Sequence, residues 1–326
     1  MRPFTVAMVG DIHIDRDDPP SIFRHIRPLL ELSDLRIGNY ESAFSTIGSP
    51  DRAKPLQWAN FRSHPRNAVA LAGLFSAVSL ASNHTLDFGL ESLTETLTVL
   101  RGHGIPHCGS GENLTAAEEP VWLDVAGLRV ALLGDTCLYL PGWEATDERP
   151  GVAAIRVRTL YEPPARVLEQ PGTPPIVRTF VAADELERVQ NHVRRARAGA
   201  DVVIVSVHWG VSEKYRLLAE YQVSLGRAFV DAGADVVFGH HPHVIQGFEV
   251  YKGRPILYSL GNFAFDLDLP SYFDDEGLIA WASFTGRQLS GCALIPIRIN
   301  AAHEPVPCDD DEARAILGRL RAMAGE

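Results

Sequence analysis

Short apolar runs alternate with stretches of helical periodicity along most of the chain. Runs of four to eight apolar residues are typical of buried strands, and apolar residues spaced three and four apart are typical of helices that cover a sheet. Strands are expected at residues 5–9, 34–37, 76–81, 121–125, 128–133, 201–207, 236–238, 255–260, 278–284 and 292–299. Helices are expected at residues 21–32, 64–74, 90–100, 183–198, 217–231 and 309–324. The alternation predicts an α/β domain whose sheets are covered by helices.

Two stretches depart from this alternation. Ala126 and Gly127 separate two of the apolar runs and predict a hairpin with a tight turn. Residues 141–178 hold many of the prolines and little periodicity, so we expect an irregular excursion that contributes to the substrate surface. No linker rich in Gly or Ser divides the chain, and a single domain is expected over residues 1–326, with a C-terminal helix at about residues 309–324.

Composition narrows the functional classes. The 326 residues carry a formal net charge of −11, with 46% hydrophobic and 22% charged residues, which is typical of a soluble globular protein. A net acidic chain without a basic cluster argues against nucleic acid as a partner, whereas a small anionic substrate is compatible with it because bound divalent metals reverse the local field. The four cysteines lack C-x-x-C spacing and are expected to be free thiols. Neither a signal-peptide core nor an integral membrane segment is expected, which favours a cytoplasmic location.

Side chains that bind metals follow five of the expected strands. Carboxylate, imidazole and amide oxygen ligands suit Mn, Fe, Zn or Ni better than a thiolate-type centre does. Seven or more ligands are too many for one tetrahedral ion and suit two divalent metal ions that share a bridging carboxylate. The candidates are Asp11 and His13, Glu41, Asn83 and His84, His208, and His241 with His243.

Each of these motifs also has an ordinary structural explanation. An Asp-x-His pair can be a hydrogen-bonded turn, Asn83 a helix N-cap, and a lone glutamate a surface acid. His208 can pack around Trp209, and a histidine cluster can lie on a surface loop. Five such motifs at successive strand ends favour a shared metal site, since agreement across levels is itself evidence. Pro242 is expected to hold His241 in extended backbone geometry and so to fix the direction of its ring.

Six sequence motifs contain these candidate ligands. They are G-D-I-H-I-D-R (10–16), G-N-Y-E (38–41), A-S-N-H-T-L-D-F-G (81–89), H-W-G (208–210), D-A-G-A-D-V-V-F-G-H-H-P-H-V-I-Q (231–246) and Y-S-L-G-N-F-A-F-D (258–266). Together they resemble the metallo-dependent phosphatase (calcineurin-like) superfamily, and more closely its bacterial CapA branch, which is associated with capsule and poly-γ-glutamate synthesis. The resemblance is thin only over residues 141–178 and the tail. It implies a four-layer α/β sandwich, with two mixed sheets flanked by helices.

The chain departs from CapA proteins at two points. CapA-like proteins usually carry Met where this chain has His13, whereas the wider superfamily carries His there, which favours a fully furnished first metal site. Membrane-anchored CapA proteins also have an N-terminal transmembrane segment, which is not expected here. A direct capsule role at the membrane is therefore less well supported than the metal site.

The resemblance also assigns the metal ligands residue by residue. It implies that Asp11, His13 and His243 bind the first metal, that Asn83, His208 and His241 bind the second, and that Glu41 bridges them in place of the usual Asp. His240 is excluded, because that position varies in the family pattern.

These assignments imply a hydrolase. Two bound metals would activate a water for attack on a phosphoester or phosphoanhydride, and His84 would protonate the leaving group or hold its developing charge. Asp87 either orients His84 and raises its pKa or caps the helix that follows. Arg16 either grips an anionic substrate or forms a surface salt bridge. Asn262 and Trp209 are expected to face the substrate.

Two other functions are compatible with the same residues. The first is chemistry on a γ-glutamyl or other peptide amide or carboxylate, with a peptide-like substrate. The second is a non-catalytic scaffold in polymer synthesis, against which the retention of His13, Asn83 and His84 argues. The sequence leaves open the substrate, the metal and the oligomeric state.

Overall fold

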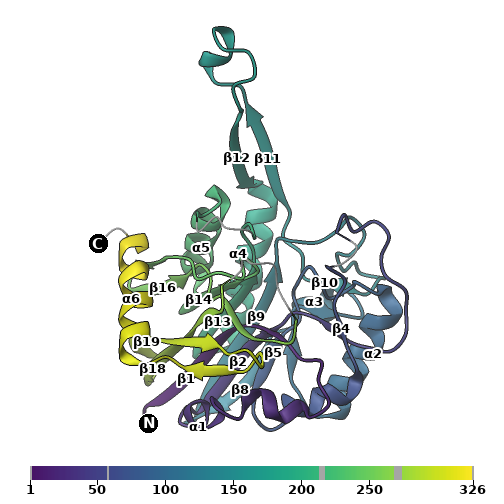
Figure 1. Cartoon of the computed structure of the whole chain (residues 1–326), viewed down its shortest axis with the longest axis vertical. Helices are drawn as coiled ribbons and strands as arrows, with labels where there is room; N and C mark the ends of the chain where they lie inside the picture. Colours follow the sequence, from purple (N-terminus) through teal and green to yellow (C-terminus); the bar gives the residue numbers. More distant parts are fainter. Residues whose placement is uncertain (1, 57–58, 213–216, 268–273, 325–326) are drawn as a thin grey trace.

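Two mixed β-sheets form the body of the protein, and helices cover them (Figure 1). The structure is a computed structural model that describes residues 2–56, 59–212, 217–267 and 274–324. The eight-stranded sheet runs in the order β20 (Pro305–Pro307), β19 (Gln288–Ile299), β18 (Glu276–Thr285), β1 (Phe4–His13), β2 (Leu35–Tyr40), β5 (Ala77–Ser79) and β6 (His107–Cys108), with β17 (Asn262–Phe265) paired to β1. The six-stranded sheet runs in the order β15 (Phe248–Tyr251), β16 (Arg254–Leu257), β14 (Val236–His240), β13 (Val202–His208), β9 (Leu128–Thr136) and β8 (Val121–Val125).

The described residues also include shorter strands, and helices. Three two-stranded sheets pair β3 (Ala43–Phe44) with β4 (Arg62–Ser63), β7 (Ser110–Gly111) with β10 (Gly151–Val152), and β11 (Val157–Glu162) with β12 (Ile176–Val181). The α-helices are α1 (Arg27–Leu30), α2 (Gly89–Gly102), α3 (Leu114–Glu118), α4 (Ala183–Gly199), α5 (Glu220–Ala232) and α6 (Asp310–Ala324). The 3-10 helices are η1 (Pro19–Phe23), η3 (Pro65–Ala70) and η4 (Ala165–Leu168).

Alternation along the buried strands produces the layers. Successive side chains of a strand point to opposite faces. On β1, Val6 and Met8 pack between the two sheets, whereas Ala7 and Val9 pack in the core that includes α2. The strand β13 does the same, since its even-numbered residues face the other sheet and its odd-numbered residues face α4 and α5. The fold predicted from the motifs, two mixed sheets flanked by helices, is confirmed.

Two expected helices were wrong in their extent. Residues 21–32 form η1 and the four-residue α1 instead of one helix. Pro28 has no backbone N–H and clashes with the carbonyl one turn earlier, so a continuous helix cannot run through it. The stretch 64–74 contains only the 3-10 helix η3.

The hairpin is confirmed, because Ala126 and Gly127 adopt φ values of 54° and 78° in the turn between β8 and β9.

The expectation of an irregular excursion at residues 141–178 was also wrong. It contains β10, β11 and half of β12, and the ribbon of β11 and β12 projects from the body (Figure 1, teal). We call residues 157–181 the arm. The prolines cluster between its two strands, where turns tolerate them, so they do not interrupt the ribbon.

Two further expectations concern the thiols and the membrane. Cys108, Cys137, Cys292 and Cys308 are all free thiols, as expected. Among the described residues, no helix combines the length and apolar character that crossing a bilayer requires.

Candidate metal centre

The ends of five strands from the two sheets bring the candidate ligands together. Asp11 lies beside Asn39 of β2 and Asn262 of β17 in the eight-stranded sheet. In the six-stranded sheet His208 lies beside His240, the last residue of β14. Two glycines permit this convergence. A Cβ at Gly10 would lie 1.9 Å from the Gly261 carbonyl oxygen, and one at Gly239 would lie 2.2 Å from the Tyr258 carbonyl oxygen.

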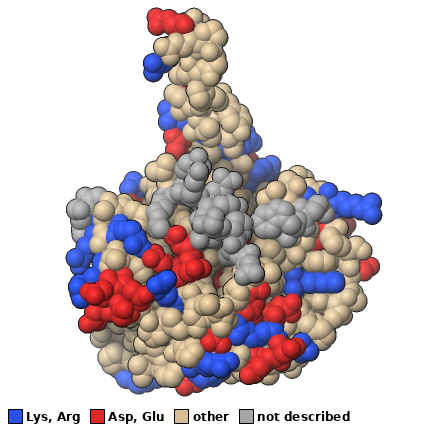
Figure 2. All heavy atoms as spheres, viewed as in Figure 1, with Lys and Arg blue, Asp and Glu red and all other residues tan. Residues whose placement is uncertain are grey.

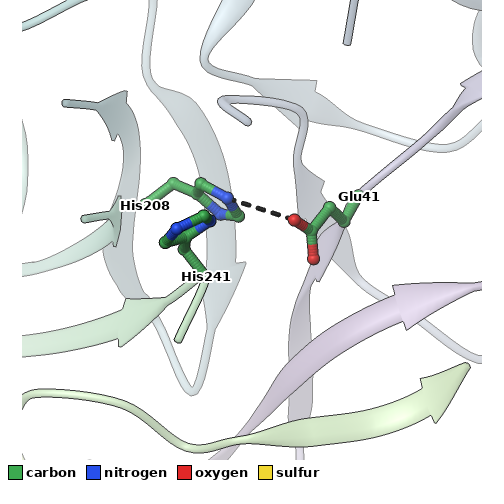
Figure 3. Close-up of side chains that lie close together, drawn as sticks. All are labelled: Glu41, His208 and His241. Atoms are coloured by element: carbon green, nitrogen blue, oxygen red, sulfur yellow. Dashed lines mark ion pairs between the residues drawn. The ribbon is translucent and has the colours of Figure 1, made fainter. Parts of the chain in front are cut away.

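Glu41 belongs to two candidate metal-binding groups. One consists of Glu41, His208 and His241, and the other of Asp11, Glu41 and His243; in each, the possible ligand atoms lie within 4.8 Å of one another. Figure 3 shows His208 and His241 turned toward the Glu41 carboxylate. His208 Nε2 lies 3.2 Å and His243 Nε2 3.7 Å from the same oxygen, Glu41 Oε1. One carboxylate oxygen thus faces an imidazole of each group.

Of the two remaining expected ligands, Asn83 lies beside one of these groups and His13 lies outside both. Asn83 Oδ1 lies 2.6 Å from His208 Nε2, which places the amide beside the second group. His13 belongs to neither group, although it is buried. Its ring lies 5.7 Å from the Phe61 ring and 5.5 Å from the Phe265 ring, measured between centroids. His13 Nδ1 has no hydrogen-bond partner among the described residues.

The backbone at the two clustered histidines differs from expectation. His241 has φ 94° and His243 has φ 56°, both in the left-handed region that side chains with a Cβ rarely adopt. The extended geometry predicted for His241 from Pro242 was therefore wrong. Non-glycine residues in such conformations cost of order 1–3 kcal/mol each and persist where the surrounding structure holds them, most often at functional sites.

The donor set fits divalent cations. Glu41 is fully buried, and neither of its carboxylate oxygens accepts a hydrogen bond from the described residues. Burial, with the nearby Asp11 charge, holds the pKa of Glu41 well above its usual range, and Lys54 opposes this only partly. A buried carboxylate that lacks hydrogen bonds is costly unless a counter-charge is supplied. A divalent ion held by Glu41 and the flanking histidines would supply that charge.

The pKa of Asp11 is shifted in the opposite direction from that of Glu41. Burial tends to raise its pKa, but His240, His243 and His208 lower it below the ordinary range. Asn39 Nδ2 donates to Asp11 Oδ1 at 2.8 Å, and the His241 backbone N–H donates to Oδ2 at 3.1 Å. These contacts hold the carboxylate ionised and oriented, as outer partners of metal ligands commonly do.

Sequence reasoning missed two residues at this site, Asn39 and Lys54, and excluded a third, His240, as a ligand. Asn39 Nδ2 lies 3.3 Å from His208 Nδ1 as well as contacting Asp11, so it touches a ligand of each group. His240 was excluded as a ligand and belongs to neither group, but it is fully buried with Nδ1 3.4 Å from Asp11 Oδ1. Lys54 carried no signal because it lies in a stretch without periodicity. Asn39 stands two residues before Glu41 in the G-N-Y-E motif, where it could have been found.

His84 and Asp87 form a buried pair beside Glu41. His84 Nδ1 lies 2.7 Å from Asp87 Oδ2, and His84 Nε2 lies 3.8 Å from Glu41 Oε1. Phe61 stacks on the His84 ring at 3.9 Å and donates its backbone N–H to Asp87 at 2.6 Å. The orienting role of Asp87 thus has a direct contact, and the N-cap of α2 is Phe88 instead.

The expected rise in the pKa of His84 was wrong. Burial lowers that pKa well below its usual value, and the ammonium of Lys54, 2.9 Å from Nδ1, lowers it further. Lys54 also forms an ion pair with Asp87 and donates to the Asn83 carbonyl oxygen at 3.3 Å. Burial raises the pKa of Asp87 to about 7, against the opposing charge of Lys54. Because Lys54 neutralises Asp87, the carboxylate orients the imidazole without raising its pKa.

The Arg16 guanidinium is turned toward internal partners. Its Nε and Nη2 donate to the Asp266 carboxylate, and Nη2 also donates to the Ala302 carbonyl oxygen at 2.8 Å. Nη1 donates to Ser21 Oγ at 3.2 Å and Glu304 Oε1 at 3.3 Å. These bonds use all five N–H donors of an arginine. The structure therefore supports the salt-bridge explanation of Arg16 over substrate binding.

Two expected substrate contacts lie elsewhere. Trp209 is fully buried in the core beneath α5 and donates its indole N–H to the Tyr258 carbonyl oxygen at 2.8 Å. Its expected contact with substrate is contradicted, because packing explains the residue. Asn262 does face the site, where its Oδ1 lies 2.8 Å from His243 Nδ1. That contact orients a candidate ligand.

Comparison with known proteins identifies related sequences. Residues 5–267 match the family described as "Bacterial capsule synthesis protein PGA_cap". The "Capsule biosynthesis protein CapA" of Bacillus anthracis is 33% identical over 273 residues, which cover 80% of this chain and 60% of that protein. The "PGA biosynthesis protein CapA" of Bacillus subtilis (strain 168) is 29% identical over 272 residues, covering 80% and 63%. The chain therefore spans less than two thirds of the length of these relatives.

Solved structures are more distant. A hypothetical protein from Thermus thermophilus is 15% identical, covering 90% of this chain and 98% of that chain, with a TM-score of 0.48. The calcineurin-like phosphoesterase YfkN from Bacillus subtilis is 14% identical, covering 98% and 97%, with a TM-score of 0.46.

Proposed function

From the premise that the chain belongs to the PGA_cap family of bacterial capsule synthesis proteins, we propose that it is a hydrolase that depends on two divalent metal ions. The observation that carries the proposal is the Glu41 carboxylate, buried without a hydrogen bond from the described residues between two groups of histidines. The CapA-like resemblance of the motifs is confirmed by the family match. The activity is the further step, and it rests on the arrangement of the ligands.

Seven residues are available to hold the ions. Asp11 and His243 with Glu41 form one subsite; His13, on the same strand as Asp11, lies outside that group and is the additional ligand that the resemblance implies. His208 and His241 with Glu41 form the other, with the Asn83 amide oxygen beside them. Mn, Fe, Zn and Ni all suit this mixture of oxygen and nitrogen ligands. When bound, such a pair of ions supplies Lewis acidity and lowers the pKa of water.

The protein's own residues then manage protons and charge. His84 points Nε2 toward Glu41 Oε1, so a proton on this nitrogen faces the site. Asp87 accepts the hydrogen bond from Nδ1, and stacking on Phe61 fixes the plane of the ring. The low pKa leaves the imidazole largely neutral near pH 7, so it is the protonated fraction of His84 that releases a proton to a leaving-group oxygen, and it does so readily. General acid catalysis of this kind contributes about 10²–10⁴-fold in rate.

A phosphoester or phosphoanhydride is the leading substrate class. Phosphoryl oxygens carry negative charge, and a site with two divalent ions and Lys54 nearby stabilises that charge. A γ-glutamyl or other peptide amide is the second class. It is favoured by the names of relatives, including the "PGA biosynthesis protein CapA" of Bacillus subtilis and a "Probable polyglutamine synthesis accessory protein" of Mycobacterium tuberculosis.

Turnover by the Mn-loaded chain separates these substrate classes. We expect hydrolysis of p-nitrophenyl phosphate or bis-p-nitrophenyl phosphate, lost in His84→Ala and kept in the matched control His103→Ala, whose side chain is exposed at the end of α2. If no phosphoester is hydrolysed while His84→Ala abolishes cleavage of a γ-glutamyl peptide, the amide class replaces the phosphoester class. If neither substrate is turned over by metal-loaded protein, a non-catalytic scaffold replaces the hydrolase.

A further inference from the structure

The arm exposes apolar side chains that the body does not cover. Leu160, Tyr161, Val177 and Phe180 are 54%, 66%, 52% and 43% exposed. A two-stranded ribbon is only marginally stable in water by itself, and stability normally requires further strands or packing against another element. Figure 2 shows the arm standing clear of the body, with charged groups at its tip and along its sides and uncharged atoms over most of the visible face. The exposed apolar side chains on a projecting ribbon leave surface that a further strand could cover.

The two outer edges of the ribbon differ. The N-terminal end of α5 covers the edge of β12, because the Thr179 N–H donates to Glu220 Oε2 at 3.1 Å and the Tyr221 N–H donates to Thr179 Oγ1 at 3.3 Å. On β11, by contrast, every residue from Arg158 to Glu162 is exposed. Exposed strand edges are templates for pairing with another strand. Of the two edges, that of β11 is therefore the one open to such pairing over its length.

The hydrogen bond from Thr179 also fixes which backbone groups of β11 point outward. In an antiparallel pair, opposite residues direct their N–H and C=O groups either both inward or both outward. Thr159 lies opposite Thr179, whose N–H points away from β11. Thr159 and Tyr161 therefore present their backbone donors and acceptors at the open edge. The intervening Leu160 directs its own toward β12.

The sequence of β11 is complementary to itself across a two-fold axis at Leu160. If two copies pair antiparallel about this residue, Arg158 of each lies opposite Glu162 of the other, and Leu160 meets Leu160. Thr159 then lies opposite Tyr161, so the outward backbone groups of the two strands meet. Opposite charges directly across strands are stabilising and like charges are destabilising. The same operation on β12 about Arg178 would oppose two arginines.

We propose that the arm is a dimerisation surface, on which β11 pairs antiparallel with β11 of a second copy to form a four-stranded sheet. The interface is isologous, so it closes and leaves no further edge of β11 open. The two β12 strands become the outer strands, each already covered by α5 of its own subunit. This inference is independent of the proposed activity.

A charge swap tests the pairing in the full chain. Because the two-fold axis doubles each contact, Arg158→Glu creates two Glu–Glu contacts and is expected to weaken dimerisation about tenfold or more, as measured by sedimentation velocity across a dilution series. Adding Glu162→Arg restores opposite charges and is expected to recover most of the loss. Arg166→Glu makes the same charge change at the tip and serves as the matched control. The proposal is overturned if the double variant dimerises as weakly as Arg158→Glu alone, or if Arg166→Glu weakens dimerisation equally.

A cross-link tests the register. Leu160→Cys places two thiols in a directly opposed pair, whose Cα atoms lie about 4.5–5.5 Å apart in antiparallel sheets, within the range that a disulfide requires. We expect mild oxidation to convert this variant to covalent dimers, and to leave Leu168→Cys, at the exposed tip, mostly uncoupled. Wild-type protein that stays monomeric up to about 100 µM, or a dimer that Leu160→Cys does not cross-link, overturns the proposal in favour of another partner or another surface.

Discussion

The metal centre and the arm depart from the usual separation of apolar interior and polar exterior in opposite ways. At the centre, the Glu41 carboxylate is buried without a hydrogen bond from the described residues. On the arm, apolar side chains such as Tyr161 stand in solvent. Both arrangements are unfavourable in an isolated chain. Each therefore points to a missing partner of matching chemistry: divalent cations for the centre and a second apolar strand for the arm.

Among the variants considered, Glu41→Gln is expected to change activity and stability the most. Removing the shared carboxylate charge should lower metal-dependent activity by about 10³-fold or more, since several kcal/mol of charge stabilisation depends on the ions. In metal-free protein the same change removes a buried carboxyl group that is costly to ionise, and at alkaline pH it should raise the unfolding temperature. Thermal unfolding with and without Mn measures this reversal. If Glu41→Gln is the less stable protein in both states, the carboxylate is not there to bind cations; Glu91→Gln, on the exposed face of α2, is the control.

His84→Ala should separate proton transfer from metal binding. The imidazole contacts Asp87 and approaches Glu41 but belongs to neither candidate group. We expect kcat to fall about 10²–10⁴-fold while the metal content is unchanged. Loss of metal together with activity would instead place His84 among the ligands. Elemental analysis of the same preparation decides between them.

Asp135 tests whether every buried carboxylate in this protein implies a ligand. It is 1% exposed at the end of β9, and His192 lies 3.9 Å away as an ion-pair partner. Burial raises its pKa from 3.8 to about 6. The folded state thus holds the proton more tightly than the unfolded state, so this group's stabilising contribution is complete below about pH 4 and is lost as the pH rises through about 6.

Asp135→Asn should accordingly flatten the pH dependence of stability in that window. Two pKa units correspond to about 3 kcal/mol, so the variant should gain up to that amount at pH 7.5. Urea unfolding at pH 4.5 and 7.5 measures the difference. A variant that is less stable than wild type at pH 7.5 would show that the ionised carboxylate is compensated by a partner, as we propose for Glu41.

The smallest change in the free energy of unfolding is expected for a substitution on the arm. Leu168→Ala, at the tip, removes a side chain that is already 87% exposed and should change the free energy of unfolding by no more than about 0.5 kcal/mol. The matched change Leu225→Ala, on the buried face of α5, should cost about 2–5 kcal/mol. A cost above about 1 kcal/mol for Leu168→Ala would mean that the tip packs in the folded protein.

Much of the centre could be predicted because its signals are local in sequence. The strands β13 and β14 are continuous apolar runs, and their ligands follow at or just after the strand ends. The ligand groups then depend only on parallel strands meeting at one edge. The helix at residues 21–32 failed because one proline outweighed the periodicity. Outside these runs, prediction depended on contacts that lie far apart in sequence.

Arg16 and Lys54 show why the rest could not be predicted. The partner of Arg16 is Asp266, 250 residues later, so a free guanidinium and a salt-bridged one look identical in sequence. Lys54 reaches Asp87 across 33 residues of mostly irregular chain. The arm is a third case: Arg158, Glu162 and Arg178 interrupt the apolar pattern of the ribbon, and the complementarity of β11 emerges only once its open edge is known.

Metal content per chain tests the central claim most directly. After gentle purification and loading with Mn, elemental analysis of the wild-type chain should find two ions per chain, with fewer in Glu41→Gln and an unchanged value in Glu91→Gln. Well below one ion per wild-type chain, or two ions retained by Glu41→Gln, would contradict a two-metal site that shares the Glu41 carboxylate.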